Sequence, residues 1–190
     1  TLFPATGWVN SSGTFNTVAQ VPGGSGGVKS LTIGCYMDGL LKKLTGAMGT
    51  WRMILPTGRP AYVEWTFTGV WNAPTDVAII TPTYPTDENP IRFASGTCSY
   101  NSDALKVEQV TIDAGNEISM VEDPTTASGY SHAVVTSRHP SISANPECSL
   151  VATRDTYGDW IGHTEAAFDL QLDGASTSTL DIDAPKAQIV

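Results

Sequence analysis

Hydrophobic and polar residues alternate along much of the chain, which is the pattern of half-buried β-strands. The clearest case is 61–68, where Val63, Trp65 and Phe67 share one face and polar residues occupy the other. The same alternation at 31–37 places Cys35 in phase with the hydrophobic positions, so we predict a buried core thiol there. Further strands are predicted at 40–44, 51–55, 105–113, 118–122, 131–137, 142–150, 168–172 and 180–182.

Turn signals separate the predicted strands. Asp38–Gly39 predicts a tight hairpin, because glycine readily adopts positive φ. Loops are predicted at 22–27 and 174–178, and the first lacks the strand, helix and lysine that a phosphate-binding loop requires. Residues 155–163 predict a short helix with Trp160 and Ile161 on its buried side. Together with 18 glycines and 12 prolines, these signals predict a mainly all-β class.

Four prolines interrupt the pattern between 72 and 90, which predicts a long loop or an excursion at a sheet edge. Long structured loops often carry function, so we expect this one to contact a neighbouring subunit. The candidate contact residues are Asn72, Pro74, Ile79, Ile80, Tyr84 and Pro90.

Composition fits one domain of ordinary size over the 190 residues, with 41% hydrophobic and 15% charged residues. The net charge of −9 and only ten basic residues argue against a phosphate-binding surface for nucleic acid. A net negative charge of this size either maintains solubility or repels DNA, so that DNA slides along the protein surface without sticking to it. No apolar run approaches the roughly 20 residues of a membrane span, and residues 1–10 lack a signal-peptide pattern.

Residues with catalytic or metal-binding chemistry are scattered. The three cysteines are neither a disulfide framework nor a zinc motif, and His132, His139 and His163 do not form a local ligand pair. There is no G-x-S-x-G nucleophile motif, and Glu64 lies on the opposite strand face from Trp65, which disfavours a glycosidase cleft. We therefore predict no catalytic residue, no cofactor and no metal site.

Acidic residues alternate with hydrophobic ones near the end of the chain. They form a solvated sheet face, a Ca²⁺ site if loops bring several oxygens together, or a negative wall that faces DNA. The D-x-D-x-D-G pattern of a calcium loop is incomplete. The candidate acids for a DNA-facing wall are Glu64, Glu108, Asp169, Asp173, Asp181 and Asp183.

Several short motifs of the chain occur together, in this order, in one known family. They are Asp38–Gly39, LTGA followed by GT at 44–50, TFTG at 66–69, NAPTD at 72–76, TIDAGNE at 111–117 and APKAQ at 184–188. In these motifs the chain resembles the major tail tube proteins of long-tailed, siphovirus-like bacteriophages.

The resemblance implies a β-sandwich or barrel-like protomer with one short flanking helix. Six protomers would form a ring, rings would stack into a tube, and strands of all six would close into one inner barrel that conducts the viral DNA. The other implied partners are the tape measure and terminator proteins, and the implied location is the virion tail, assembled in the reducing cytoplasm of the host bacterium. Relatives of this kind are longer, so we expect terminal segments to be missing from this single tail-tube domain over 1–190.

Other classes stay open on the sequence alone. A carbohydrate-binding or adhesive β-sandwich module would be favoured by exposed Trp and Tyr side chains that converge. A hydrolase of unusual type would need a histidine beside a nucleophile in a concave site. A tail terminator or decoration protein is not distinguished by sequence.

Overall fold

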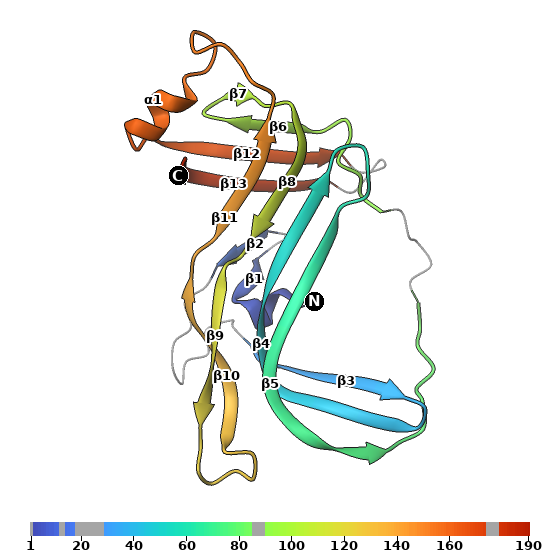
Figure 1. Cartoon of the computed structure of the whole chain (residues 1–190). Helices are drawn as coiled ribbons and strands as arrows, with labels where there is room; N and C mark the ends of the chain where they lie inside the picture. Colours follow the sequence, from blue (N-terminus) through green and yellow to red (C-terminus); the bar gives the residue numbers. More distant parts are fainter. Residues whose placement is uncertain (1, 12–13, 18–28, 85–89, 174–178) are drawn as a thin grey trace. The chain divides into compact units, whose positions relative to one another are not determined.

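The computed structural model describes residues 2–11, 14–17, 29–84, 90–173 and 179–190, so the loops predicted at 22–27 and 174–178 lie outside the described residues. The chain is mainly β-structure with one short α-helix (Figure 1), which confirms the predicted class. The elements are η1 (Phe3–Thr6), β1 (Trp8–Ser11), β2 (Thr14–Thr17), β3 (Leu31–Met37), β4 (Leu40–Pro56), β5 (Tyr62–Asp76), β6 (Thr97–Tyr100), β7 (Asp103–Ala104), β8 (Val107–Asp113), β9 (Asn116–Glu122), β10 (Tyr130–Arg138), β11 (Ser141–Pro146), α1 (Thr156–Ile161), β12 (Glu165–Asp173) and β13 (Thr179–Gln188).

The strands form four sheets within two compact units. The first unit comprises Thr1–Arg52, Glu64–Pro85 and Asp113–Ser141, and the second comprises Met53–Val63, Thr86–Ile112 and Ile142–Val190. One sheet has the order β11-β8-β4-β3, with β5 paired to β4, and a second has the order β13-β12-β6-β7. β1 pairs with β2, and β9 pairs with β10.

The first unit is organised around the long strand β4. β3 and β4 form a hairpin whose loop residues, Asp38 and Gly39, have φ of 43° and 83°, which confirms the predicted tight turn. The register shifts between Leu31 and Ile33 of β3, opposite the part of β4 that contains Gly46 at φ 57°. A bulge with a left-handed glycine bends a strand, and this one joins the two segments predicted at 40–44 and 51–55 into a single strand.

Aromatic packing and one buried amide hold the beginning of the chain in the first unit. The rings of Phe3 and Trp8 meet Trp51 edge-on, at centroid distances of 5.9 and 5.5 Å. The Asn116 Nδ2 group donates to the Thr6 and Gly49 carbonyl oxygens, each at 2.9 Å. Asn116 is buried, and these bonds satisfy its Nδ2 group, whose burial without a partner would be costly.

The second unit is a two-layer arrangement in which β12 and β13 lie behind β8 and β11 (Figure 1). Its buried side chains come from both layers, as the alternation in the sequence predicts. They include Leu55 and Val110 from one sheet and Cys98, Leu170 and Leu172 from the other.

Three predictions about burial or length are wrong. Cys35 is exposed, because β3 is a terminal strand of its sheet and this end of the hairpin is poorly covered. The predicted strand 142–150 ends at Pro146. Of the two alternatives for 72–90, a loop from Asn72 is wrong: Asn72–Asp76 belong to β5, an edge strand that accommodates Pro74, as the alternative of an excursion at a sheet edge predicts, and the segment without strands begins after Asp76.

The predicted helix exists, but the predicted burial of its hydrophobic residues is wrong. The Asp155 carboxylate caps α1 by accepting from the Gly158 N–H at 2.8 Å. Trp160 and Ile161 are 51% and 72% exposed, and no residue of α1 is buried. Six residues give fewer than two turns, so this helix presents little surface to the sheet.

Candidate interaction surfaces

The solvent face of the sheet in the second unit is acidic. Asp169 of β12 lies directly opposite Asp183 of β13, and Gln171 lies opposite Asp181. On the other edge of β12, Asp169 lies opposite Ser99 of β6. All three acids are exposed, whereas the intervening Leu170 and Leu172 are buried. The structure thus brings Asp169, Asp181 and Asp183 together, and we call these three residues the acidic face.

The other predicted acids lie elsewhere. Asp173 pairs with Thr179 at the end of β12, but its side chain is outside the described residues. Glu64 is exposed on β5 and belongs to the first unit. Glu108 is exposed on β8, in a different sheet of the second unit from the acidic face.

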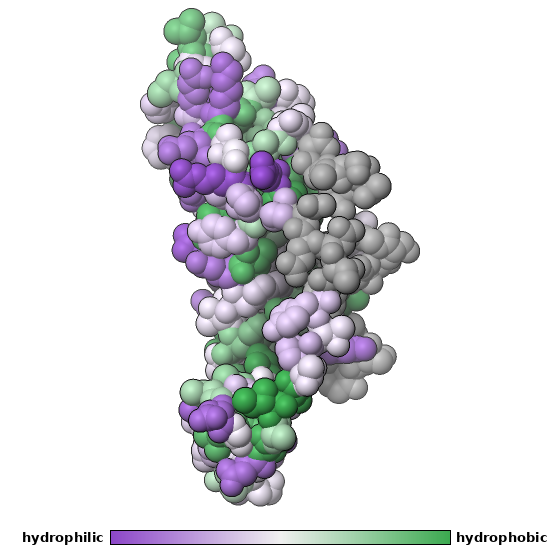
Figure 2. Space-filling view, turned by 90° about the vertical axis from the view of Figure 1, so that its right-hand side faces the viewer, coloured by the Kyte–Doolittle hydropathy of each residue, from purple (hydrophilic) through white to green (hydrophobic). Residues whose placement is uncertain are grey.

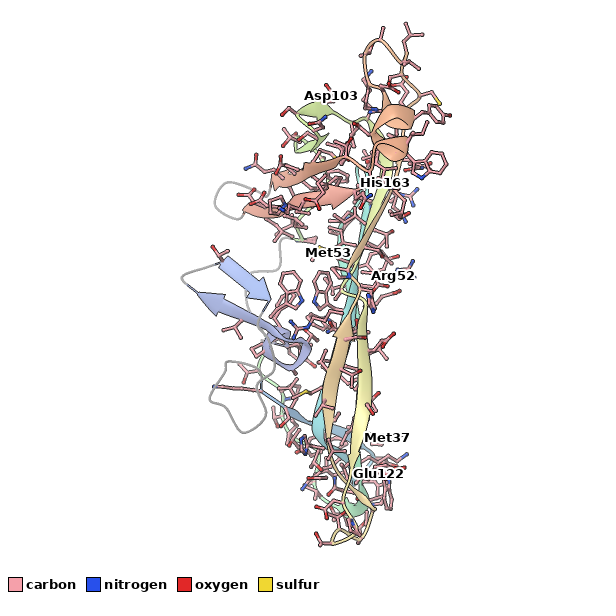
Figure 3. All side chains as sticks on the ribbon, turned by 90° about the vertical axis from the view of Figure 1, so that its left-hand side faces the viewer. Met37, Arg52, Met53, Asp103, Glu122 and His163 are labelled. Atoms are coloured by element: carbon pink, nitrogen blue, oxygen red, sulfur yellow. The ribbon has the colours of Figure 1, made fainter. Side chains whose placement is uncertain are left out.

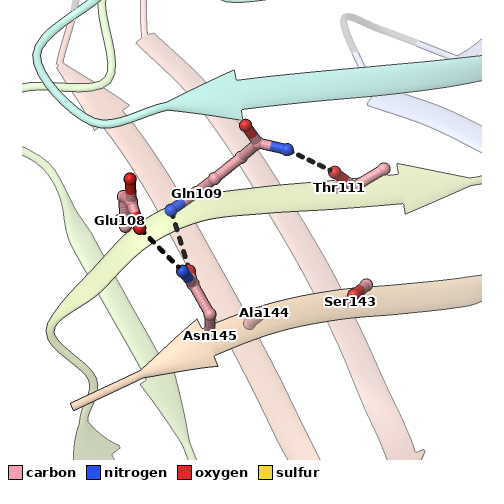
Figure 4. A pocket seen from close by; sticks show the side chains of 6 residues that line it. All are labelled: Glu108, Gln109, Thr111, Ser143, Ala144 and Asn145. Atoms are coloured by element: carbon pink, nitrogen blue, oxygen red, sulfur yellow. Dashed lines mark hydrogen bonds between the residues drawn. The ribbon is translucent and has the colours of Figure 1, made fainter.

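Glu108 lines a polar pocket of about 250 Å³ between β8 and β11 (Figure 4). The Asn145 Nδ2 group donates to Glu108 Oε2 at 3.1 Å, and the Gln109 N–H donates to Asn145 Oδ1 at 3.0 Å. The Gln109 Nε2 group donates to Thr111 Oγ1 at 3.2 Å. The polar groups therefore satisfy one another, and the six lining residues include no histidine or cysteine.

The histidine and cysteine side chains that the structure describes do not gather into a metal site. The described residues contain no group of three or more His, Cys, Asp and Glu side chains that could hold a metal ion. The nearest partners of the histidine rings are neutral, with His132 Nδ1 3.1 Å from Ser131 Oγ and His163 Nδ1 3.0 Å from Gln188 Nε2. Burial raises the pKa of the Cys98 thiol to about 11, so it stays protonated and unreactive at neutral pH.

The predicted contact residues at 72–90 divide into two groups. Asn72 lies in β5, where its Nδ2 group donates to Thr45 Oγ1 at 2.8 Å and to the Val70 carbonyl oxygen at 3.1 Å. Pro74 follows it in the same strand. Ile79, Ile80, Tyr84 and Pro90 are exposed and outside any strand.

Five exposed hydrophobic residues lie on α1 and in the segment before it, and two of them, Trp160 and Ile161, were predicted to be buried. The five are Leu150, Val151, Tyr157, Trp160 and Ile161. We call these five residues the α1 patch. Figure 3 shows His163 at the end of α1, where the chain turns into β12.

Comparison of the chain with models of known families, with curated proteins and with solved structures gave no match. Among the described residues, none of the helices has the length and hydrophobicity that crossing a membrane requires.

Proposed function

We propose that this protein is the major tail tube subunit of a long-tailed bacteriophage. In this role it is a structural virion protein without enzymatic activity, and it assembles as stacked hexameric rings through which DNA leaves the capsid. The sequence motifs of the tail tube family support the proposal, as does the predominance of β-strands. The proposed partners are further copies of the chain, other tail proteins, and DNA that passes without sequence-specific contact.

The observation that carries the proposal is the open edge of β5. Within the described ranges, β4 is the strand neighbour of β5, so its outer edge has no strand partner. β5 spans Tyr62–Asp76 and has no charged residue between Glu64 and Asp76. A long, uncharged edge strand is a template for pairing with another chain, and closure of such strands into a barrel removes the edge.

A contrast within the same chain strengthens this argument. β13 is also a terminal strand of its sheet, but it contains Pro185 and Lys186. Proline and lysine are the residues that proteins place on edge strands to prevent association. β5 has one proline near its end, Pro74, and no lysine, so its edge is suited to pairing.

The acidic face provides the second support. DNA that passes through a protein channel must not adhere to the wall, and like charge prevents adhesion. Asp169, Asp181 and Asp183 have no basic residue opposite them in the sheet register. The nearest ion pair on β12 and β13, Lys186 with Glu165 at 3.2 Å, lies at the other end of the hairpin.

The test is electron microscopy and light scattering on the purified full-length protein. Hexameric rings or hollow tubes are expected. Thr66→Lys and Thr68→Lys each place one charge on an exposed position of β5 and should prevent ring closure. Ala127→Lys is the control, because it adds one charge in the turn after β9, outside β5. A wild-type chain that remains monomeric at high concentration would contradict the proposal.

One observation favours a different function, a carbohydrate-binding or adhesive module. Tyr157 and Trp160 are both exposed and lie three positions apart on α1, so their rings share one side of the helix. Aromatic surfaces of this kind stack on sugars. Glycan screening tests this alternative, which requires binding by a monomer and loss of binding in Trp160→Ala.

A further inference from the structure

The α1 patch exposes about as much hydrophobic surface as the largest patch on a typical monomer, and it does so on a short segment. Each of its five side chains is more than half exposed. Aromatic side chains carry about 150–250 Å² each and aliphatic ones about 100 Å², so the patch exposes on the order of 500 Å². The largest patch on a typical monomer is about 300–600 Å² and is often functional, and a stable interface uses about 800 Å² from each partner.

Local hydrogen bonds hold this patch in place. The Thr153 and Arg154 N–H groups donate to the Leu150 carbonyl oxygen at 2.8 and 3.0 Å, which closes the turn before α1. After the helix, the Thr164 N–H donates to the Asp159 carbonyl oxygen at 3.0 Å. A surface that is already ordered loses little conformational entropy when it binds.

The sheet of the second unit anchors the same segment. The Tyr100 hydroxyl of β6 donates to the Thr164 carbonyl oxygen at 3.4 Å, and Gln188 of β13 meets His163 at 3.0 Å. Burial, together with the charge of Asp159, raises the pKa of Tyr100, so this hydroxyl keeps its proton and remains a donor. The patch therefore faces outward from a fixed base.

Two of the charged groups beside the patch, those of Arg154 and Asp155, already have hydrogen-bond partners. Arg154 donates through Nε to Thr156 Oγ1 at 3.3 Å and through Nη2 to the Glu147 carbonyl oxygen at 3.1 Å. Asp155 caps the helix. Because the five exposed members of the patch are hydrophobic, a partner for this surface should be hydrophobic as well.

The first unit presents such a segment at 77–84, with the sequence VAIITPTY. It contains no charged residue, and Val77, Ile79, Ile80 and Tyr84 are exposed. Its start is fixed by the Val77 N–H, which donates to the Gly39 carbonyl oxygen at 2.8 Å, and Pro82 stiffens it further along. Figure 2 shows that hydrophobic residues gather near the lower end of the face that it draws.

We propose that the α1 patch of one copy binds segment 77–84 of a second copy. The two surfaces are different parts of the chain, so the contact is heterologous, and every copy has one of each to offer. Such contacts close into a ring or extend without limit, as a tube requires. The inference rests on the proposed self-assembly and names a contact that is separate from the β5 edge.

Mixing two variants tests this contact. Ile161→Asp damages the patch and Ile79→Asp damages the segment, at side chains that are 72% and 62% exposed, so both variants should fold. A charge buried at the centre of an interface should weaken binding as much as the loss of a hot-spot residue does. We therefore expect either variant alone to associate about 30-fold more weakly than the control. Tyr130→Asp, an exposed aromatic outside both surfaces, is the matched control.

To isolate the contact, all variants carry Thr66→Lys and Thr68→Lys, and their mass is measured by light scattering after circular dichroism confirms folding. An equimolar mixture of the Ile161→Asp and Ile79→Asp chains should form a dimer and stop there, because one intact surface of each kind remains. A mixture that stays monomeric, or an Ile161→Asp chain that associates like the control, overturns the inference. If the contact fails this test but the wild-type chain still forms rings, the proposed function stands without the contact. A wild-type chain that stays monomeric contradicts both the contact and the proposed function.

Discussion

Two neighbouring residues of β12 should respond to mutation in opposite ways. Leu170 is 1% exposed and lies opposite Ile182 and Cys98, whereas Asp169 is exposed and lies opposite Asp183. We predict that Leu170→Ala strongly destabilises the protein and that Asp169→Asn does not. The acidic face depends on this assignment of sides, so the pair of mutations tests it directly.

The magnitudes follow from burial and distance. A fully buried leucine replaced by alanine loses its transfer free energy and leaves a cavity, which together cost about 3–5 kcal/mol. At about 2–4 °C per kcal/mol for a chain of this size, the melting temperature should fall by about 6–20 °C. Two carboxylates about 5.5 Å apart in water repel by about 0.7 kcal/mol, and physiological salt roughly halves this, so Asp169→Asn should stabilise by a few tenths at most.

Urea unfolding followed by circular dichroism measures both changes. Leu150→Ala is the matched control, because the same substitution at a side chain that is 78% exposed should change stability by less than about 0.5 kcal/mol. The effect of Asp169→Asn should vanish in 1 M salt, where the Debye length is about 3 Å. A loss above about 1 kcal/mol in Asp169→Asn, or a loss below that in Leu170→Ala, would refute the assignment of the two faces.

Three further predictions follow from other residues. A Cβ atom on Gly96 would collide with the Gln171 carbonyl oxygen, whereas a Cβ atom on Gly58 would meet open space. Gly96→Ala should therefore lower the melting temperature more than Gly58→Ala, in which the only strain comes from the φ of 75°. Burial raises the pKa of Cys98 from 9.0 to about 11, so between these pH values the folded state retains a proton that the unfolded state loses. The stability of the protein should therefore fall as the pH rises from 9 to 11, and Cys98→Val should remove this contribution to the fall. When Asp169, Asp181 and Asp183 are replaced by Lys, the assembled protein should retain DNA in a gel-shift assay at low salt, and DNA ejection from particles that carry the variant should be slower. Unchanged retention and ejection would argue against a repelling wall.

The sequence predicts best where local chemistry decides the structure. Asp38–Gly39 specifies a hairpin because both residues tolerate positive φ, and the alternation around Leu170 and Leu172 specifies a strand with one buried face. The division of β4 into two predicted segments has a physical cause. Gly46 introduces a bulge, and one extra residue reverses the phase of the hydrophobic pattern, so the pattern appears interrupted.

Predictions that depend on distant parts of the chain were less successful. Cys35, Trp160 and Ile161 have the spacing of buried residues, but burial requires another element above them, which no local pattern reveals. The acidic face could be predicted only in part. The acids could be read from alternation, but the position of Asp169 opposite Asp183 depends on strand register. The α1 patch was missed for the same reason as the exposure of Trp160.

The buried amide of Asn116 links the fold of the first unit to the order of synthesis. Its hydrogen bonds reach the Thr6 carbonyl oxygen across 110 positions of sequence and the Gly49 carbonyl oxygen across 67. The turn at Phe3–Thr6 is therefore synthesised well before Asn116 and cannot be locked by it until the 110 positions between Thr6 and Asn116 have been added. Contacts of such separation slow folding. Until Asn116 has been synthesised, the turn depends on contacts with residues closer in sequence, such as the packing of Phe3 against Trp51.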